Sequence, residues 1–300
     1  MKRVLITGSN GLLGQKLVDL ILETGRAEII ATSKGINRHP IKTGYVYDEL
    51  DITDIDQLRT VVSGHHPDVI INTAAMTNVD ACEKNKELCW QLNVDAVKYL
   101  AEVCEEKNIH LIHLSTDFIF DGEKGPYSEE DEPNPLSYYG KSKLEAENIL
   151  KASACKWTIL RTIIVYGIVK DMSRSNIILW AKSALEKGAP INVVNDQWRM
   201  PTLAEDLAEC CMLAAEKGIG GVFNASGKDM MSILEIVQAV ADFWGLDKSL
   251  INPISAESLN QDAKRPVKTG FILDKARKEL GYQPHSFKEG LEIVKQQLNG

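Results

Sequence analysis

A tyrosine and a lysine spaced one helical turn apart are the residues of this sequence best suited to chemistry. Tyr139 and Lys143 lie in the segment SYYGKSK, and a helix there would put both side chains on one face. Carbonyl reduction needs an acid for the developing alkoxide, and a phenol with its ordinary pKa of about 10 is a slow one at neutral pH. A neighbouring ammonium stabilises the phenolate and lowers that pKa. We therefore expect Tyr139 to donate the proton and Lys143 to tune it, although this spacing also arises by chance on surface helices.

A hydroxyl at the end of a predicted strand could complete such a site. The strand HLIHLST ends at Thr116, and the carboxyl ends of parallel strands form the ligand crevice of an open α/β sheet. A hydroxyl there can hydrogen-bond a substrate carbonyl oxygen and stabilise the charge that develops on it. Thr116 is the first candidate and Ser115 the second; the alternative is a hydroxyl that only closes a turn.

Three glycines near the N-terminus predict a dinucleotide site. The apolar run RVLIT is followed by GSNGLLG and then by a helical pattern. Glycines at this spacing permit a tight turn and a close backbone approach to a pyrophosphate, while the helix N-terminus adds partial positive charge. The candidate cofactor ligands in this loop are Gly8, Asn10, Gly11, Leu12 and Gly14. Tyr139 and Lys143 join them, because the lysine could reach the nicotinamide ribose.

The end of the second predicted strand indicates which dinucleotide binds. Enzymes specific for NAD usually carry an acidic residue there, on the ribose 2′-hydroxyl. Here the strand EIIATS ends in Ser33, followed by Lys34 and Arg38, so no carboxylate would repel a 2′-phosphate and two cations could pair with one. We expect NADPH to be preferred, with NADH usable; the alternative is that both cations are solvated loop charges.

The third predicted strand contributes a further candidate cofactor contact. Asp51, with Ile52 beside it, directly follows the run YVYDEL at the end of this strand and could accept a hydrogen bond from an adenine amine. It could instead cap the helix that begins at Ile55, a role equally open to Thr53 or Asp54.

Short β-branched runs alternate with amphipathic segments through the first half of the chain, which predicts a doubly wound parallel Rossmann sheet of the α/β class. The predicted strands there are RVLITG, EIIATS, YVYDEL, DVIINTA, HLIHLST and WTILRT, and the predicted helices are 12–23, 55–63, 86–107 and 138–151. Further on we expect helices at 175–186, 203–216, 233–244 and 274–280 and strands INVVND and GVFNAS. The chain should re-enter the nucleotide domain after INVVND. We therefore expect residues 1–167 plus about 200–226 to form the NAD(P)-binding domain, and about 168–199 plus 227–300 to form a smaller α/β substrate-binding region.

Composition limits the classes of partner. The chain has 300 residues, 44% of them hydrophobic, and a net charge of −8, which disfavours nucleic-acid binding. No apolar run is long enough to span a membrane. The six cysteines form no CxxC pair, so we expect reduced thiols in a cytoplasmic protein. His110 and His113 would lie on opposite faces of one strand, so we expect no metal site.

Several longer segments resemble those of a known family. They are TGSNGLLG, INTAAMTNVDACE, LNVDAV, LSTDFIFDGEKGPYSEEDEPNPLSYYGKSKLEAE, LRTIIVYG, NDQWRMPTLAEDLA and KRP, in order across nearly the whole chain. Together they resemble the extended short-chain dehydrogenases/reductases, and among these the dTDP-4-dehydrorhamnose reductases. The resemblance implies a triad of Thr116, Tyr139 and Lys143.

The same resemblance implies a substrate and further site residues. The reaction would be hydride transfer from NAD(P)H to C4 of a nucleotide-linked 4-keto sugar, foremost dTDP-4-dehydro-L-rhamnose, giving dTDP-L-rhamnose. Asn72, Ala74 and Ala75 would line the cofactor, Asn93 would support the active site, and Arg265 would bind the substrate diphosphate unless it forms a surface salt bridge. A homodimer is compatible with this family.

The departures from the family pattern lie on the substrate side. Met76 and Phe118 stand where the family often has tyrosine, and Ile164 where it often has tryptophan. Trp198 could replace a lost stacking surface or be a core aromatic. Because buried polar complementarity drives substrate discrimination, these changes leave the sugar open.

Two other functions are compatible with the same residues. One is a nucleotide-sugar epimerase or dehydratase, which retains its NAD because the hydride returns to the substrate. The other is a non-catalytic regulatory subunit like that of methionine adenosyltransferase.

Overall fold

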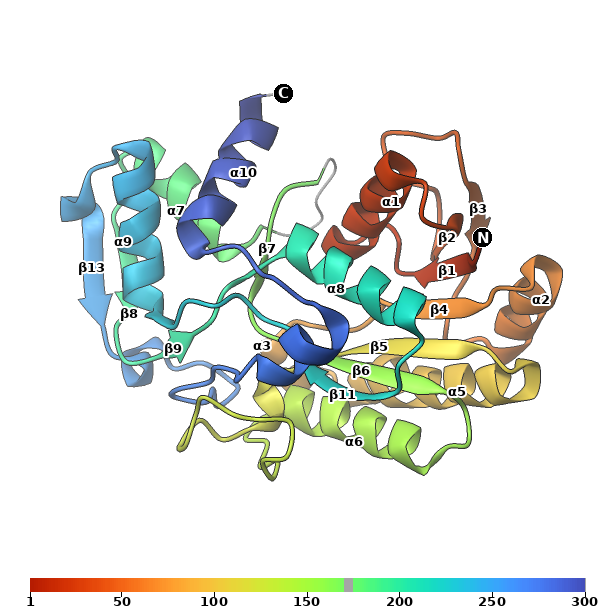
Figure 1. The fold of residues 1–300 in the computed structure, drawn as a ribbon. Coiled ribbons are helices and arrows are strands. Elements are labelled where there is room, and N and C mark those ends of the chain that lie inside the picture. The colour runs from red at the N-terminus through yellow and green to blue at the C-terminus, as the bar shows by residue number, and fades with distance from the viewer. Residues whose placement is uncertain (170–174, 300) are drawn as a thin grey trace.

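A parallel seven-stranded sheet forms the centre of the protein (Figure 1). The computed structural model describes residues 1–169 and 175–299, so residues 170–174 of the expected substrate-binding region, and residue 300, lie outside the described residues. The strand order is β3-β2-β1-β4-β5-β6-β11, and every neighbouring pair is parallel. The strands are β1 (Arg3–Thr7), β2 (Glu28–Ser33), β3 (Val46–Glu49), β4 (Val69–Asn72), β5 (His110–Thr116), β6 (Trp157–Thr162) and β11 (Gly221–Asn224). The predicted doubly wound Rossmann sheet is confirmed, and its order reverses between β1 and β4, where such sheets bind ligands.

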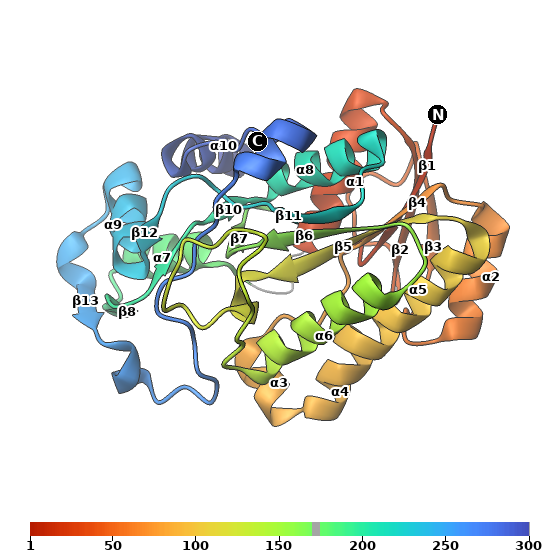
Figure 2. The ribbon, with the colours of Figure 1, turned by 60° about the horizontal axis from the view of Figure 1, so that its bottom comes forward.

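Helices cover both faces of the sheet, as Figure 2 shows. One face carries α1 (Leu12–Thr24) and α8 (Ala204–Lys217), and the other carries α2 (Ile55–His65), α5 (Ala96–Lys107) and α6 (Tyr138–Ala152). Alternate residues of one strand enter different cores: Val4 and Ile6 pack toward α1, whereas Leu5 packs toward α2 and α5. Burial on both faces explains why the strands are almost continuously apolar.

A third hydrophobic core lies beyond one end of the sheet. It gathers α7 (Ile177–Glu186), β8 (Ile191–Val194), α9 (Ile233–Trp244), β13 (Ile251–Ile254) and α10 (Phe287–Asn299) (Figure 1). Short pairs β7 (Val165–Tyr166) with β10 (Thr202–Leu203), and β9 (Trp198–Arg199) with β12 (Met231–Ser232), lie between this core and the sheet. Between these segments the chain returns to the central sheet through α8 and β11.

Two predicted helices differ from the structure: residues 274–280 end in a π-helical turn (Ala276–Leu280), and residues 86–107 are divided. Residues 86–107 form α4 (Lys86–Trp90), a π-helical turn (Gln91–Asp95) and α5, preceded by α3 (Val79–Lys84). The wider turn carries Asn93, whose amide oxygen accepts from Met76 N (2.8 Å) and whose nitrogen donates to Met76 O (3.0 Å). π-Helical turns often occur at functional sites, and this one binds the chain that follows β4. No helix within residues 1–169 and 175–299 is long and apolar enough to cross a membrane.

Helix α6, which carries the Tyr139–Lys143 pair, is attached to the sheet by buried charge. Arg161 of β6 donates two hydrogen bonds to the Glu147 carboxylate, at 2.9 and 2.8 Å, and both side chains are fully buried. Burial alone would raise the pKa of Glu147, but the hydrogen bonds and charge of Arg161 hold that pKa below its usual value. The helix begins on Ser137, whose hydroxyl accepts from Gly140 N (3.1 Å). A side chain at Gly140 would collide with the Phe118 carbonyl oxygen, so glycine allows the close approach of α6 to the end of β5.

We predict that Arg161→Met lowers the free energy of unfolding by about 3–5 kcal/mol, because it leaves the Glu147 carboxylate buried without its partner. Urea unfolding followed by circular dichroism measures the loss. The matched control is Arg59→Met, whose pair with Glu106 is exposed (2.7 Å) and should contribute little, because solvent screens it. Since the folded-state pKa of Glu147 is lowered, the contribution of the pair should be present above about pH 4.5 and disappear at more acid pH. Equal losses in the two variants would contradict the proposed anchoring.

Candidate active site

A cavity of about 640 Å³ opens at the carboxyl ends of β1, β4, β5 and β6. Its volume is within the range of small-molecule sites. It is lined by residues from the glycine loop, from the end of β4, from β5 and from α6, among them Asn10, Gly11, Leu12, Ala74, Ala75, Thr116, Tyr139 and Lys143. The sheet therefore brings together four segments that are far apart in the sequence.

The glycine loop shapes one wall of the cavity. Gly8 has a left-handed φ of 66°, and a side chain at Gly14 would collide with the Gly8 carbonyl oxygen. Gly11 caps α1 without any side-chain hydrogen bond to the first turn. The exposed N–H groups and partial positive charge of a thirteen-residue helix thus face the cavity, a fit for a pyrophosphate.

Asn10 connects this loop to the segment after β2. Its side chain donates to Ile36 O (2.9 Å) and accepts from Arg38 N (2.8 Å). Ser33 ends β2, and Lys34 follows it with a largely exposed side chain that pairs with the Asp51 carboxylate at 2.6 Å. Asn10 therefore holds Arg38 near the cavity, although Arg38 is outside the cavity lining.

Asp51 is held in place within its own loop. Besides Lys34, its carboxylate accepts from Thr53 N (3.0 Å) and Thr53 Oγ1 (2.7 Å). Burial opposes its charged form, but these partners keep the pKa of Asp51 below its ordinary value. Asp54 is the residue that caps α2, so the helix-capping alternative for Asp51 is wrong, and Ile52 is buried in the core between the sheet and α2.

The three predicted triad residues lie on the wall of this one cavity, and all are buried. Thr116 Oγ1 accepts from Phe118 N (3.3 Å), so it also closes the turn that was the alternative reading. Burial raises the pKa of Tyr139 above its ordinary value, although a hydrogen bond with Thr116 acts in the opposite direction, so the net shift is opposite to the lowering by Lys143 expected from the sequence. The buried phenol therefore keeps its proton at neutral pH.

Lys143 has a partner that the sequence did not suggest. Its Nζ lies 3.0 Å from His113 Nε2, and burial lowers the pKa of Lys143 to about 8, against the opposing charges of Glu147 and Cys89. The other ring nitrogen of His113 is 3.1 Å from Asn72 Nδ2. His110 points elsewhere and bonds Thr158 Oγ1 at 2.7 Å, and the described residues hold no cluster of metal ligands.

The expected substrate-side residues divide into two groups. Phe118 and Ile164 line the cavity, and Ile164 adopts a left-handed φ of 27°, a strained value for a β-branched residue. Met76, Trp198 and Arg265 are outside its lining. Met76 packs in the cluster behind Tyr139, and its backbone is fixed by Asn93, which also donates to Ser142 Oγ of α6 (3.0 Å).

Arg265 is engaged by a carboxylate in this structure. Its guanidinium donates to the Asp80 carboxylate of α3 at 2.6 and 3.2 Å and to Ala263 O at 3.1 Å. The Arg265 hydrogen bonds lower the pKa of Asp80 against the effect of burial. The salt-bridge alternative of the sequence analysis is thus present, on a partly buried side chain.

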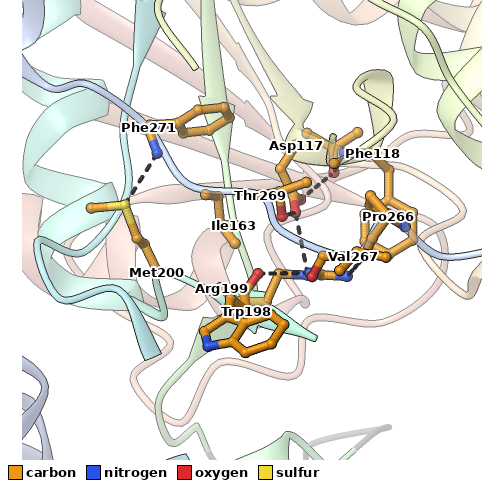
Figure 3. Close-up of polar contacts among 12 residues, drawn as sticks. Asp117, Phe118, Ile163, Trp198, Arg199, Met200, Pro266, Val267, Thr269 and Phe271 are labelled. Carbon is orange, nitrogen blue, oxygen red and sulfur yellow. Dashed lines mark hydrogen bonds and ion pairs between the residues drawn. The ribbon is translucent and has the colours of Figure 1, made fainter. Parts of the chain in front are cut away.

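A buried ion pair beside Thr116 was missed by sequence reasoning (Figure 3). The Asp117 carboxylate is 3.6 Å from Arg199 Nε and accepts a short hydrogen bond from the Thr269 hydroxyl and one from Thr116 Oγ1 (3.1 Å). Arg199 also donates to the carbonyl oxygens of Trp198 (2.7 Å), Pro266 (2.8 Å) and Val267 (3.3 Å). Burial raises the pKa of Asp117, opposed by the charge of Arg199. The pair joins the end of β5 to the segment that follows Arg265. Its one signal in the sequence is that Asp117 and Arg199 both lie in segments that resemble the family, LSTDFIFDG and NDQWRMP.

Comparison with known proteins places the chain in a family. The model of the RmlD substrate binding domain matches residues 1–299. A dTDP-4-dehydrorhamnose reductase of Aggregatibacter actinomycetemcomitans is 33% identical, covering 98% of this chain and 99% of that protein. Methionine adenosyltransferase 2 subunit beta of Danio rerio is also 33% identical, over 88% of this chain and 81% of its own length.

Solved structures agree with this placement. A dTDP-4-dehydrorhamnose reductase of Bacillus anthracis, crystallised in complex with NADP, superposes with a TM-score of 0.84 at 27% identity, covering 99% of each chain. The chain is therefore a member of the RmlD substrate binding domain family and an extended short-chain dehydrogenase/reductase.

Proposed function

We propose that this protein uses NADPH to reduce the C4 keto group of a nucleotide-linked sugar, with dTDP-4-dehydro-L-rhamnose as substrate and dTDP-L-rhamnose as product. The observation that carries the proposal is that Thr116, Tyr139 and Lys143 line the same cavity as the N-terminus of α1, which has no side-chain cap. The family, and the reductases among its full-length relatives, support the same reaction.

The chain's own residues supply the proton and the orientation, while bound NADPH supplies the hydride. As hydride reaches C4, the carbonyl electron pair moves to oxygen, and that oxygen takes the proton of the Tyr139 hydroxyl, leaving a phenolate that regains a proton from solvent. The Thr116 hydroxyl, which donates to the Asp117 carboxylate in this structure, would turn to donate to the carbonyl oxygen and stabilise its growing charge. Lys143 in its ammonium form stabilises the phenolate and holds the ribose.

The two parts of the chain divide the ligands between them. Residues 1–167 plus about 200–226 would bind the dinucleotide, since α8 and β11 complete the sheet that carries the glycine loop. Residues 168–199 plus 227–300 would hold the sugar nucleotide, with Phe118 and Ile164 on the facing wall. Arg265 would meet the diphosphate with its guanidinium already oriented by Asp80.

The relatives named methionine adenosyltransferase 2 subunit beta are the reason to test catalysis directly. A regulatory subunit needs no proton donor, so the complete triad on a cavity supports turnover. An epimerase or dehydratase has less support, because the described site offers no carboxylate at the end of β2 that would favour tightly held NAD.

With dTDP-4-dehydro-L-rhamnose, the purified protein should oxidise NADPH at 340 nm and yield dTDP-L-rhamnose, identified by mass spectrometry and NMR. Turnover only with a different 4-keto sugar nucleotide would keep the reaction and reject the sugar. Inactivity on every keto sugar, together with recovery of a stoichiometric protein partner, would reject the reductase proposal.

Removing the phenol should remove the proton donor. We predict that Tyr139→Phe lowers kcat by about 10²- to 10⁴-fold and leaves the Kd for NADPH, followed by fluorescence, nearly unchanged. Tyr138→Phe is the matched control, because Tyr138 is the preceding residue of α6 and packs against Trp90. A Tyr139→Phe protein as active as the control would contradict the assignment.

Arg38 should set the preference for NADPH, since Lys34 is already paired with Asp51. Loss of a charged hydrogen bond of about 1.5–3 kcal/mol predicts that Arg38→Met weakens NADPH binding about 10- to 100-fold and NADH binding hardly at all. Lys42→Met, in the same loop, is the control and should change neither affinity, since Lys42 Nζ donates to Asn37 O. A wild-type preference for NADH would contradict this proposal.

A further inference from the structure

A buried polar chain runs behind the proposed catalytic pair. Lys143 Nζ is 3.0 Å from His113 Nε2, His113 Nδ1 is 3.1 Å from Asn72 Nδ2, and Asn72 Oδ1 accepts from Thr7 Oγ1 at 2.6 Å. The four side chains are each at most 2% exposed. Polar groups this deeply buried are costly unless each one has a partner, so the chain couples their orientations.

The sheet itself sets the order of this chain. Thr7, Asn72 and His113 lie directly opposite one another in the registers of β1, β4 and β5. Lys143 approaches from α6, the helix whose Arg161–Glu147 pair attaches it to β6. The distance from His113 to Lys143 is thus determined by rigid elements.

The hydrogen-bonding rules of imidazole restrict how His113 can serve Lys143. A neutral ring has one donor and one acceptor nitrogen. If Lys143 is an ammonium, Nε2 must accept, so the proton is on Nδ1 and the Asn72 amide must present its oxygen. If Lys143 is a neutral amine, Nε2 can donate to it, Nδ1 accepts, and the Asn72 amide presents its nitrogen, which is the arrangement in this structure.

The groups around the pair allow both arrangements. Complete burial, and to a lesser degree the charge of Lys143, hold the pKa of His113 well below its ordinary value, so the ring stays neutral. Lys143 is faced by Glu147 of its own helix and Cys89 of α4, and Tyr139 lies one turn away. The Glu147 oxygens already bond Arg161 and Lys151, which leaves His113 as the hydrogen-bonding partner of Lys143 within the part of the chain that the structure describes.

We propose that His113 is a positioning residue for the proposed reduction: its neutral imidazole holds Lys143 Nζ in the site and follows the protonation of the lysine by exchanging tautomers, while the Asn72 amide turns to match. The inference rests on the proposed function only for its catalytic consequence. The tautomer exchange itself is a property of the free protein. It would keep Lys143 hydrogen-bonded in both of its protonation states, at the position where it serves Tyr139.

Nuclear magnetic resonance of protein labelled with ¹⁵N in its six histidines tests the exchange without cofactor or substrate. His113→Gln assigns the signals of His113. Between pH 6 and 10, we expect the two ring nitrogens of His113 to exchange donor and acceptor shifts with a midpoint near pH 8, without forming an imidazolium. In Lys143→Met the exchange should vanish. Ring shifts that stay constant in the wild type, or an exchange that persists in Lys143→Met, would overturn the proposal.

The catalytic consequence is tested by pH profiles of kcat. The hydrogen bond from the ammonium to His113 is stronger than the one between the neutral amine and His113. Losing both should therefore lower the pKa of Lys143, so His113→Leu should move the alkaline limb of kcat about one pH unit lower. His113→Gln can accept from the ammonium and should restore the limb. His110→Leu alters the same strand but not this chain, and should leave the profile unchanged.

Thermal unfolding of each variant separates lost stability from lost positioning. Should His113→Leu not fold, the wild-type resonances still decide the proposal. If the ring nitrogens of His113 exchange their shifts with pH but the protein has no reductase activity, the proposed function alone is rejected. If the enzyme is active but the ring shifts of His113 do not change with pH, the role of His113 alone is rejected.

Discussion

The close contact between helix α6 and the carboxyl ends of β5 and β6 is the constraint on which the active site depends. It requires glycine at position 140 and a buried Arg161–Glu147 pair, because a side chain would separate the two elements and an unpaired charge could not stay between them. The same contact places Tyr139 beside Thr116 and Lys143 beside His113. The position of the proposed proton donor thus follows from the packing of α6 on the sheet, which the buried Glu147 of this helix and Arg161 of β6 hold together.

Burial gives these groups their chemical character. A phenol in a dry site keeps its proton until charge develops on a substrate oxygen, and a lysine in the same site loses its proton more easily than in water. The two shifts move the pKa values of the phenol and the ammonium apart, the first upward and the second downward. Catalysis near neutral pH would then depend on neutral partners such as His113, which hold the lysine without adding charge.

Two ion pairs connect this catalytic wall to the C-terminal region. Arg199 links Asp117, next to Thr116, to the backbone after Arg265, and Asp80 holds Arg265 itself. A change in the segment around Arg265 would therefore reach Thr116 through Asp117. This arrangement gives a physical route by which binding of a substrate on one side could orient the hydroxyl that meets its carbonyl oxygen.

What the sequence determined by itself was local in origin. Hydrophobic periodicity set the strands and helices, glycine spacing marked the phosphate loop, and the four-residue interval placed Tyr139 and Lys143 on one face, since each depends on a few neighbouring residues. The tertiary structure alone decided that Lys143 bonds His113, that Arg199 pairs with Asp117 and that Arg265 pairs with Asp80. Those partners come from separate strands, helices and loops. Which of these residues come into contact depends on the order of the strands and on the need to pair every buried charge. A local sequence pattern determines neither of these.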